Sequence, residues 1–556
     1  MTSTFQRSDA LRRLADDRFD LLVVGGGITG VGVALDAAAR GLRVALVERD
    51  DYASGTSSKS SKLVHGGLRY LQQGEIGLVY EALHERQRLR RNAPHLVRLL
   101  PFMIPVLTKH GVVSRKIARA FGSALWMYDL TGGWRIGKFH KRLSAEQAMA
   151  HLPTMPRDNL ASAYLYYDAT VDDARLALTV ARTASQRGAV VVNRAALVGL
   201  AHDERGRVNA AVVEADGTRI TVRTAAVVNA AGVWSDHVRD LDRAATEPPA
   251  TTIRPAKGVH ISVPWDKVRN DIAVVIPVPG DKRSLFVVPI GDNGDGTFQH
   301  TYIGTTDTDY QGSLDDPQCT AEDIDYILGA LNAAITTTVT TADVTGAWAG
   351  LRPLVAAAAN PHGRTADLSR RHRVSVTASG LVTITGGKLT TYREMAEDTV
   401  DAVLRYLYPD QRLVTWTRRS STKRLTLAGG QGYVDPPPGS PDAHLARRYG
   451  SMAEEVRALI RAEPALGQPL VDGLPYLRAE AIYAVRHEQA TTLDDVLSRR
   501  TRARLFDRRG AVLAAPAAAE LLARELHWSH EDLTRNLEDF TSACAREDDA
   551  ALAHSA

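Results

Sequence analysis

The sequence is poor in the features that mark secreted, membrane-spanning and nucleic-acid-binding proteins. Its 556 residues include two cysteines, Cys319 and Cys544, which excludes a disulfide framework and a CxxC metal or redox site. No run approaches the ~20 apolar residues that span a bilayer, and the polar segment 1–20 predicts no signal peptide. The formal net charge of +4 lacks the basic excess of proteins that bind nucleic acid. We therefore expect a cytoplasmic protein without a metal site or nucleic acid partner, whose contact with any membrane is peripheral.

The bulk composition is that of a large globular protein. Hydrophobic residues make up 44% of the chain and charged residues 24%, which are ordinary values, and the length suffices for two or three domains. The composition changes after about residue 415, and Gly429-Gly430 and Pro436-Pro437-Pro438-Gly439 indicate a linker. The pattern after residue 444 is mainly helical and predicts a separate C-terminal domain.

A glycine turn near the N-terminus carries the clearest chemical signal. The apolar run 21–24 predicts a buried parallel strand, and the alanine-rich segment 31–40 predicts a helix. Between them, Gly25, Gly27 and Gly30 match G-x-G-x-x-G. In this motif the first glycine permits a tight turn, the second lets a pyrophosphate approach the backbone, and the third lets the helix pack closely on the sheet.

A helix N-terminus and an acidic residue complete this site. The helix would present free N–H groups at Ile28 and Thr29, with a partial positive charge, to the phosphates. Glu48 ends the next strand, residues 44–47, where a carboxylate can accept hydrogen bonds from a ribose. Strand, turn, helix and acid together predict a bound dinucleotide.

Three further segments favour FAD as that dinucleotide. The hydroxyl-rich run 49–61 suits a cofactor bound in extended form, and the apolar strand 227–232 ends in small residues. Segment 384–392 predicts a strand, a glycine pair and a helix whose N-terminus would point at the flavin edge that becomes negative on reduction. The residues predicted to contact the cofactor in and around these segments are Thr56, Ser57, Ser58, Ser60, Lys62, Leu63, His65, Gly232, Gly387, Lys388, Leu389 and Thr390.

Several motifs resemble those of one family. The run from Gly55 to Leu71, GTSSKSSKLVHGGLRYL, resembles the signature of FAD-dependent (aerobic, respiratory) glycerol-3-phosphate dehydrogenases. Further matching stretches follow in the family's order, and they are 171–175, 257–260, 304–307, 350–354, 386–393, 486–490 and 493–501. The resemblance therefore covers nearly the whole chain.

The resemblance implies an α/β and α+β fold like that of D-amino-acid and glycine oxidases. A Rossmann-type FAD-binding domain (18–75, 170–255 and 345–410) would be interleaved with an antiparallel-sheet substrate domain (about 76–169 and 256–344), and residues 416–556 would form a helical cap. It also implies oxidation of sn-glycerol 3-phosphate to dihydroxyacetone phosphate by hydride transfer from C2 to non-covalently bound FAD. Electrons would pass on to a membrane quinone, and we expect a homodimer.

A phosphate-bearing substrate requires cations, preferably arginine, whose planar fork binds phosphate with two hydrogen bonds. The positions that match the family's substrate-binding residues are Arg69, Tyr70, Arg352, Arg370 and Lys388, with His260 nearby. Arg371 and Arg373 lie beside Arg370, so the alignment leaves open which of these three arginines is the family's residue.

Oxidation at C2 also requires loss of the hydroxyl proton, and the candidate bases are His260, Lys388 and Arg352. An arginine is a poor base because its pKa exceeds ~12. We therefore favour Arg352 as an electrostatic clamp on the developing alkoxide, with Lys388 stabilising the reduced flavin and polarising the hydroxyl.

The sequence leaves several alternatives open. An oxidase that passes electrons to O2 would share every motif, a related flavin amine oxidase would bind a carboxylate instead of a phosphate, and a flavin-bearing binding protein would have no activity. Segment 115–128 combines an apolar helical face with basic residues near its start. It fits a helix lying on an anionic membrane surface as well as one packed on the core.

Overall fold

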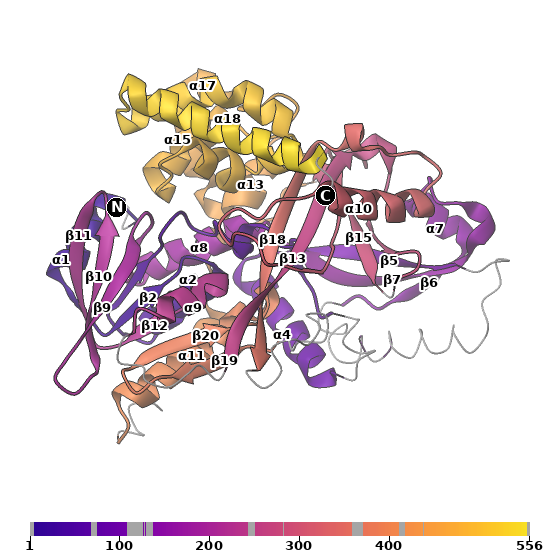
Figure 1. Cartoon of the computed structure of the whole chain (residues 1–556). Helices are drawn as coiled ribbons and strands as arrows, with labels where there is room; N and C mark the ends of the chain where they lie inside the picture. Colours follow the sequence, from indigo (N-terminus) through magenta and orange to yellow (C-terminus); the bar gives the residue numbers. More distant parts are fainter. Residues whose placement is uncertain are drawn as a thin grey trace.

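The computed structural model describes residues 5–67, 75–107, 126, 128, 137–242, 251–281, 283–357, 371–410, 418–437 and 439–552. The strands within these residues form three sheets, and a group of helices follows them at the C-terminal end (Figure 1). Three predicted substrate-binding residues, Arg69, Tyr70 and Arg370, lie outside the described residues. So does most of the amphipathic segment 115–128.

A mainly parallel sheet forms around the glycine turn. Its strands lie in the order β19-β20-β12-β2-β3-β8, and every neighbouring pair except β19–β20 is parallel. The predicted apolar runs are fully buried strands, as expected where both faces of a parallel sheet are covered. The bounds are β2 (Leu21–Val24), β3 (Val44–Val47), β8 (Val190–Val192), β12 (Val227–Asn229), β19 (Arg373–Val376) and β20 (Leu381–Thr385).

Helices and a small sheet cover the two faces of this parallel sheet. The helix α2 (Ile28–Ala39) packs between α8 (Asp173–Gln186) and α11 (Tyr392–Leu407). A meander packs on the opposite face through a shared apolar cluster. Its strands are β1 (Arg18–Phe19), β9 (Ala196–His202), β10 (Val208–Ala215) and β11 (Thr218–Thr224), and α1 (Arg7–Asp16) lies beside them.

A ten-stranded, mainly antiparallel sheet forms the other half of the molecule. The strands follow the order β17-β13-β16-β15-β14-β5-β7-β4, with β18 paired to β13 and β6 to β7. The bounds are β4 (Leu63–Val64), β5 (Arg98–Leu107), β6 (Lys141–Leu143), β7 (Leu160–Thr170), β13 (Thr251–Pro264), β14 (Ala273–Pro277), β15 (Ser284–Asp292), β16 (Phe298–Gly304), β17 (Thr308–Asp309) and β18 (Gly346–Ala357). The helices α7 (Ala145–His151) and α10 (Ala321–Ala334) share an apolar cluster with one face of this sheet.

One sequence expectation differs from this arrangement. We expected residues 345–410 to belong to the FAD-binding domain, but β18 pairs with β13 of the large sheet along its whole length, from Gly346 opposite Ser262 to Ala357 opposite Thr251. The helix α4 spans Ile76–Asn92. It ends there because Pro94 disfavours helical backbone at the residue before it, and Ala93 has φ −132° and ψ 62°.

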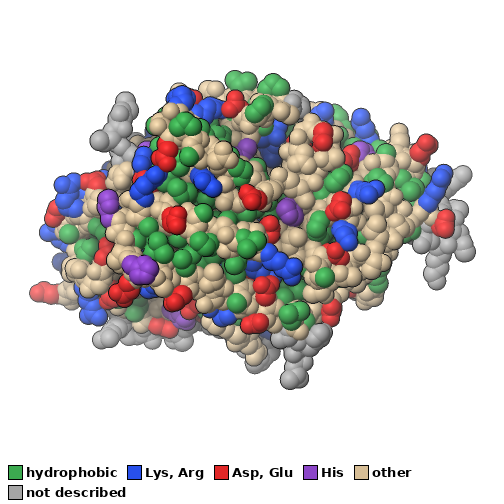
Figure 2. Space-filling view, turned by 90° about the horizontal axis from the view of Figure 1, so that it is seen from above, with side chains coloured by type: hydrophobic (Ala, Val, Ile, Leu, Met, Phe, Trp, Pro, Cys, Tyr) green, Lys and Arg blue, Asp and Glu red, His purple; other side chains and the backbone are tan. Residues whose placement is uncertain are grey.

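The C-terminal helices lie across both halves of the molecule (Figure 1). Their apolar residues share one core with aromatic side chains of the large sheet, including Phe102 and Tyr302. In the described chain no helix is long and apolar enough to cross a membrane. Seen from above, cationic and anionic side chains are interspersed over the surface (Figure 2). The bounds are α13 (Ala443–Tyr449), α14 (Ala453–Ala462), α15 (Arg478–Glu488), a π-helical segment (Asp495–Arg500), α16 (Ala503–Phe506), α17 (Arg508–Leu526) and α18 (His530–Leu552).

Candidate functional site

A cavity of about 370 Å³ lies at the carboxyl ends of β2, β3 and β12. Ligands of open parallel sheets bind at this edge, where the strand order reverses. The cavity wall includes Trp234 and the segment 195–197, which the sequence did not single out. The predicted cofactor residues that line it are Gly25, Gly27, Ile28, Thr29, Glu48, Thr56, Ser57, Gly232, Gly387, Lys388 and Leu389.

The glycine turn has no room for side chains. Gly25 has φ +112°, and a Cβ atom there would lie 2.6 Å from the Ala230 carbonyl oxygen. A Cβ atom on Gly30 would lie 1.9 Å from the Gly25 carbonyl oxygen, so the third glycine lets α2 close against the turn. Because α2 begins at Ile28, its first turn faces the cavity. This is the phosphate-binding geometry that the motif predicted, and it fits a dinucleotide.

Glu48 is held at the end of β3, beside the turn. Its Oε2 accepts a hydrogen bond from the Gly26 N–H at 2.5 Å, and its Oε1 accepts one from the Asp50 N–H at 2.8 Å. Burial raises the pKa of Glu48 to about 7, although these two hydrogen bonds favour the ionised form. The carboxyl group therefore lies in the cavity wall in a fixed orientation, as a ribose-binding acid requires.

The second glycine pair also lies in the cavity wall. Gly386 and Gly387 have φ +73° and +88°, and Lys388 and Leu389 follow them in the wall. Thr390 does not line the cavity, and its Oγ1 accepts a hydrogen bond from the His65 N–H at 3.3 Å. Thr390 and His65 thus join two of the predicted cofactor segments to each other.

Ser58, Ser60, Lys62 and Leu63 do not line the cavity. The Ser60 hydroxyl donates to Asp173 Oδ2 at 2.7 Å, and Lys62 Nζ donates to Asp173 Oδ1 at 3.1 Å. Burial and the charge of Arg502 lower the pKa of Lys62 to about 8, against the attraction of Asp173. Leu63 packs in the core beneath the large sheet. Asp173 therefore anchors the C-terminal end of the hydroxyl-rich run. The sequence motif 171–175 did not suggest this role for Asp173.

Arg352 brings three of the family motifs together. Its Nη1 donates to Asp307 Oδ1 at 2.9 Å, and its Nη2 donates to the Thr305 hydroxyl at 3.0 Å and the Thr306 carbonyl at 2.9 Å. A Cβ atom on Gly258 would lie 2.4 Å from Nη2, so the glycine leaves room for the guanidinium beside β13. The charge of Arg352 is thus fixed in place, and the next residue of β18, Pro353, lines the cavity.

His260 is a core residue. Its ring stacks on Trp348 with 5.0 Å between centroids, and its Nε2 is 2.9 Å from the Ser61 hydroxyl. Burial, with the charges of Lys62 and Arg352, holds the pKa of His260 well below its ordinary value. The imidazole is therefore neutral and weakly basic, which favours a packing role over proton transfer.

Family models match two consecutive parts of the chain. Residues 20–393 match the model described as FAD dependent oxidoreductase, and residues 420–533 match the C-terminal domain of alpha-glycerophosphate oxidase. The first match contains the glycine turn, Glu48 and the second glycine pair. The cofactor of this fold is FAD.

Relatives of known name match along nearly the full length. Glycerol-3-phosphate dehydrogenase 2 of Mycobacterium tuberculosis is 40% identical over 549 residues, covering 96% of this chain and 89% of the relative. Glycerol-3-phosphate dehydrogenase of Mycobacterium leprae is 40% identical, covering 97% and 90%. The solved glycerol-3-phosphate dehydrogenase of Bacillus halodurans, in complex with FAD, is 30% identical with a TM-score of 0.77, covering all of both chains. This chain belongs to the FAD-dependent glycerol-3-phosphate dehydrogenase family.

Proposed function

We propose that this protein oxidises sn-glycerol 3-phosphate to dihydroxyacetone phosphate and passes the electrons to a membrane quinone. The observation that carries the proposal is the fixed cation Arg352, which directly precedes Pro353 of the cavity wall, while Lys388 lines the cavity itself. A lysine in the cavity wall, together with a fixed arginine one residue from that wall along β18, suits a substrate with a phosphate and an alcohol that becomes negatively charged as it is oxidised. The names of the mycobacterial and Bacillus relatives support the same substrate.

The residues of the chain would act on the alcohol in two ways. FAD, when bound, supplies the acceptor for the hydride that leaves C2. Arg352 remains protonated throughout and stabilises the negative charge on the C2 oxygen as its proton leaves. Lys388 is our candidate for polarising the hydroxyl group, and the lowered pKa of His260 makes it a weak proton acceptor. Arg69, Tyr70 and Arg370 remain our proposed phosphate ligands.

An anaerobic titration of the purified holoprotein tests this proposal. We expect sn-glycerol 3-phosphate to bleach the oxidised flavin spectrum in a saturable manner and to yield dihydroxyacetone phosphate. Glycerol and glycine serve as controls that lack the phosphate or carry a carboxylate and amine. Bleaching by glycine would instead indicate an amine oxidase. A spectrum unchanged by all three compounds would identify a flavin-binding protein without this activity.

A second candidate function is an oxidase that uses O2. The observation that favours it is the match of residues 420–533 to a domain named for alpha-glycerophosphate oxidase. The substrate-reduced protein is mixed with a soluble quinone or with dissolved O2, and the two rates of reoxidation are compared. Fast reoxidation by quinone with little peroxide supports the dehydrogenase, and rapid stoichiometric peroxide formation supports the oxidase.

We also propose that the protein is a cytoplasmic homodimer that binds the inner face of the cell membrane peripherally. Four large apolar side chains near the undescribed segments are about half exposed, which supports a contact with lipid: Ile76 (49%), Tyr80 (51%), Trp126 (56%) and Phe139 (49%). Co-sedimentation with anionic vesicles at low salt tests the membrane contact, with Tyr80→Ser as the weakened variant. Light scattering in solution tests the dimer.

A further inference from the structure

The C-terminal motif 493–501 and the residue after it reach the loop that follows Glu48. Arg499, Arg500 and Arg502 are the side chains involved, and each is at most 10% exposed in its side chain. The loop residues that they contact, Asp51 and Ser58, lie more than 440 positions earlier in the sequence. This contact joins the C-terminal domain to the cofactor-binding part of the chain.

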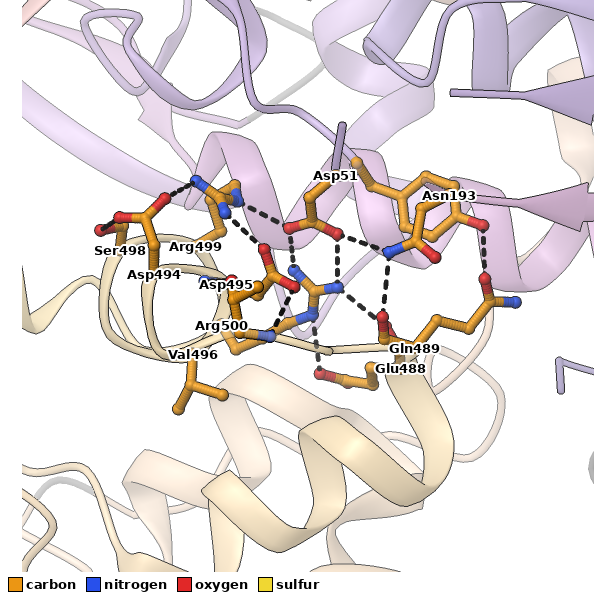
Figure 3. A network of polar contacts seen from close by, with 12 residues as sticks. Asp51, Asn193, Glu488, Gln489, Asp494, Asp495, Val496, Ser498, Arg499 and Arg500 are labelled. Carbon is orange, nitrogen blue, oxygen red and sulfur yellow. Dashed lines mark hydrogen bonds and ion pairs between the residues drawn. The ribbon is translucent and has the colours of Figure 1, made fainter. Parts of the chain in front are cut away.

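The C-terminal arginines hold the loop by two sets of contacts, called grips below, and the first set is with Asp51 (Figure 3). Arg500 donates two hydrogen bonds to the Asp51 carboxylate, from Nη1 to Oδ2 at 2.7 Å and from Nη2 to Oδ1 at 2.9 Å. Arg499 Nε donates to the same Oδ2 at 2.6 Å. Burial alone would raise the pKa of Asp51, but the charges of Arg500 and Arg499 outweigh it and hold the pKa well below its ordinary value. The carboxylate is therefore ionised and fixed by a fork of charged donors.

Further bonds connect the same grip to β8, the neighbour of β3. Asn193 Nδ2 donates to Asp51 Oδ1 at 3.0 Å and to the Gln489 carbonyl at 2.9 Å (Figure 3). The Tyr52 hydroxyl donates to Gln489 Oε1 at 2.9 Å. The segments that follow β3 and β8 are thus bound to the C-terminal domain. They are also bound to each other, because the Ala195 N–H donates to the Glu48 carbonyl.

The second grip is on the far end of the loop. Arg502 Nη2 donates to the Ser58 carbonyl and, at 2.9 Å, to Asp173 Oδ1. Arg502 has φ +79°, a left-handed backbone between Thr501, which caps the π-helical segment, and the start of α16. The same four-residue stretch of the C-terminal domain therefore holds the loop at Asp51 and again at Ser58.

The cavity-lining residues of the loop lie beside and between these two grips. They are Glu48 to Asp50 and Ser54 to Ser57. We infer that Arg500 and Arg502 are positioning residues that hold this loop in its cofactor-binding conformation and so set the affinity for FAD. A loop that is competent in only a tenth of the molecules would raise the apparent dissociation constant about tenfold. The inference concerns the cofactor alone and stands whether or not the proposed substrate is correct.

Flavin release from the full-length holoprotein tests the inference. Wild-type protein, Arg500→Gln and Arg502→Gln are diluted in series, and the rise of flavin fluorescence gives the dissociation constant of FAD without any substrate. We expect each variant to raise that constant tenfold or more. With FAD added to saturation, the KM for sn-glycerol 3-phosphate should stay within twofold of wild type, because no substrate contact has changed.

The matched control is Arg504→Gln. Arg504 lies in the same segment and loses the same charge, but its partners Asp494 and Glu547 both belong to the C-terminal domain. We expect FAD affinity to be unchanged in this variant, even where its melting temperature falls. If Arg500→Gln does not fold, Arg500→Lys retains the charge and loses the bidentate fork. Unchanged FAD affinity in folded variants at positions 500 and 502, or an equal loss in Arg504→Gln, overturns the inference.

Discussion

The two sides of the loop from Glu48 to Ser58 differ in what they contact. The side toward the cavity carries Glu48, whose pKa is raised, then Arg49 and Asp50, and it ends in the small residues 54–57. The side away from it carries Asp51, bound by arginines of the C-terminal domain. On our inference, this charged frame outside the pocket fixes the loop around the space that the cofactor fills. Asp307 holds Arg352 in a similar way, through an ion pair at 2.9 Å.

Filling the pocket side should have the largest effect. Gly25→Val would place a branched side chain at φ +112° against the Ala230 carbonyl, where even a Cβ atom lies at 2.6 Å. We expect any soluble protein to be recovered without flavin, as measured by visible absorbance. Gly41→Ala is the control, since Gly41 also has positive φ but no atom within 4 Å of its Cβ position. Stoichiometric FAD in Gly25→Val would contradict the role given to the turn.

Breaking the charged side should destabilise the fold. Asp51→Ala leaves Arg500 and Arg499 buried without the carboxylate that they share, which costs about 3–5 kcal/mol when one partner of a buried pair is removed. Chemical denaturation of the holoprotein measures this loss. Glu463→Ala removes the exposed pair with Arg524 and should cost under ~1 kcal/mol. Equal losses in the two variants would show that the frame is no stronger than a surface ion pair.

Arg352 is held by Asp307 and is also our proposed clamp on the developing alkoxide. We expect Arg352→Ala to retain FAD and to lose about 10²–10³ in kcat, the range for removing a preorganised donor to a developing oxyanion. Steady-state kinetics measures this. Because the variant also removes the ion pair with Asp307, Arg352→Met with Asp307→Asn separates the two roles. Recovery of kcat in the double variant would remove Arg352 from the chemistry and leave it a structural part.

The smallest expected effect is a pH dependence of FAD affinity. With its pKa raised to about 7 by burial, Glu48 is mostly protonated at pH 6 and mostly ionised at pH 8. Ribose hydroxyls donate to the ionised form, so binding favours loss of the proton, and affinity should rise about tenfold across this range. Titrations at several pH values measure it. Glu48→Gln cannot ionise and should show a flat profile, and a profile like that of wild type would assign the dependence to another group.

The pocket side could be predicted from the sequence and the charged side could not. The roles of Gly25, Glu48 and Gly387 can be predicted because they depend on neighbours within a few positions, namely a strand before and a helix after. The stretches 171–175 and 493–501 match family motifs, but nothing in the sequence pairs Arg500 with Asp51 or Arg502 with Asp173, because the partners lie at opposite ends of the chain. For the same reason the sequence did not reveal the pairing of β5 with β7, whose partners, such as Arg98 and Thr170, lie far apart along the chain. Nor did it reveal the attachment of β18 to the large sheet.

The contact between Arg500 and Asp51 can form only late in the synthesis of the chain. At 5–20 residues per second, the ribosome needs roughly 20–90 s to add the 449 residues that separate these two positions. The glycine turn, Glu48 and the parallel sheet are all made before the residue that secures them. On our inference, a nascent chain can therefore meet FAD early but retains it firmly only after its last domain has emerged. Chains truncated before Arg500 would then bind FAD more weakly than the full-length protein.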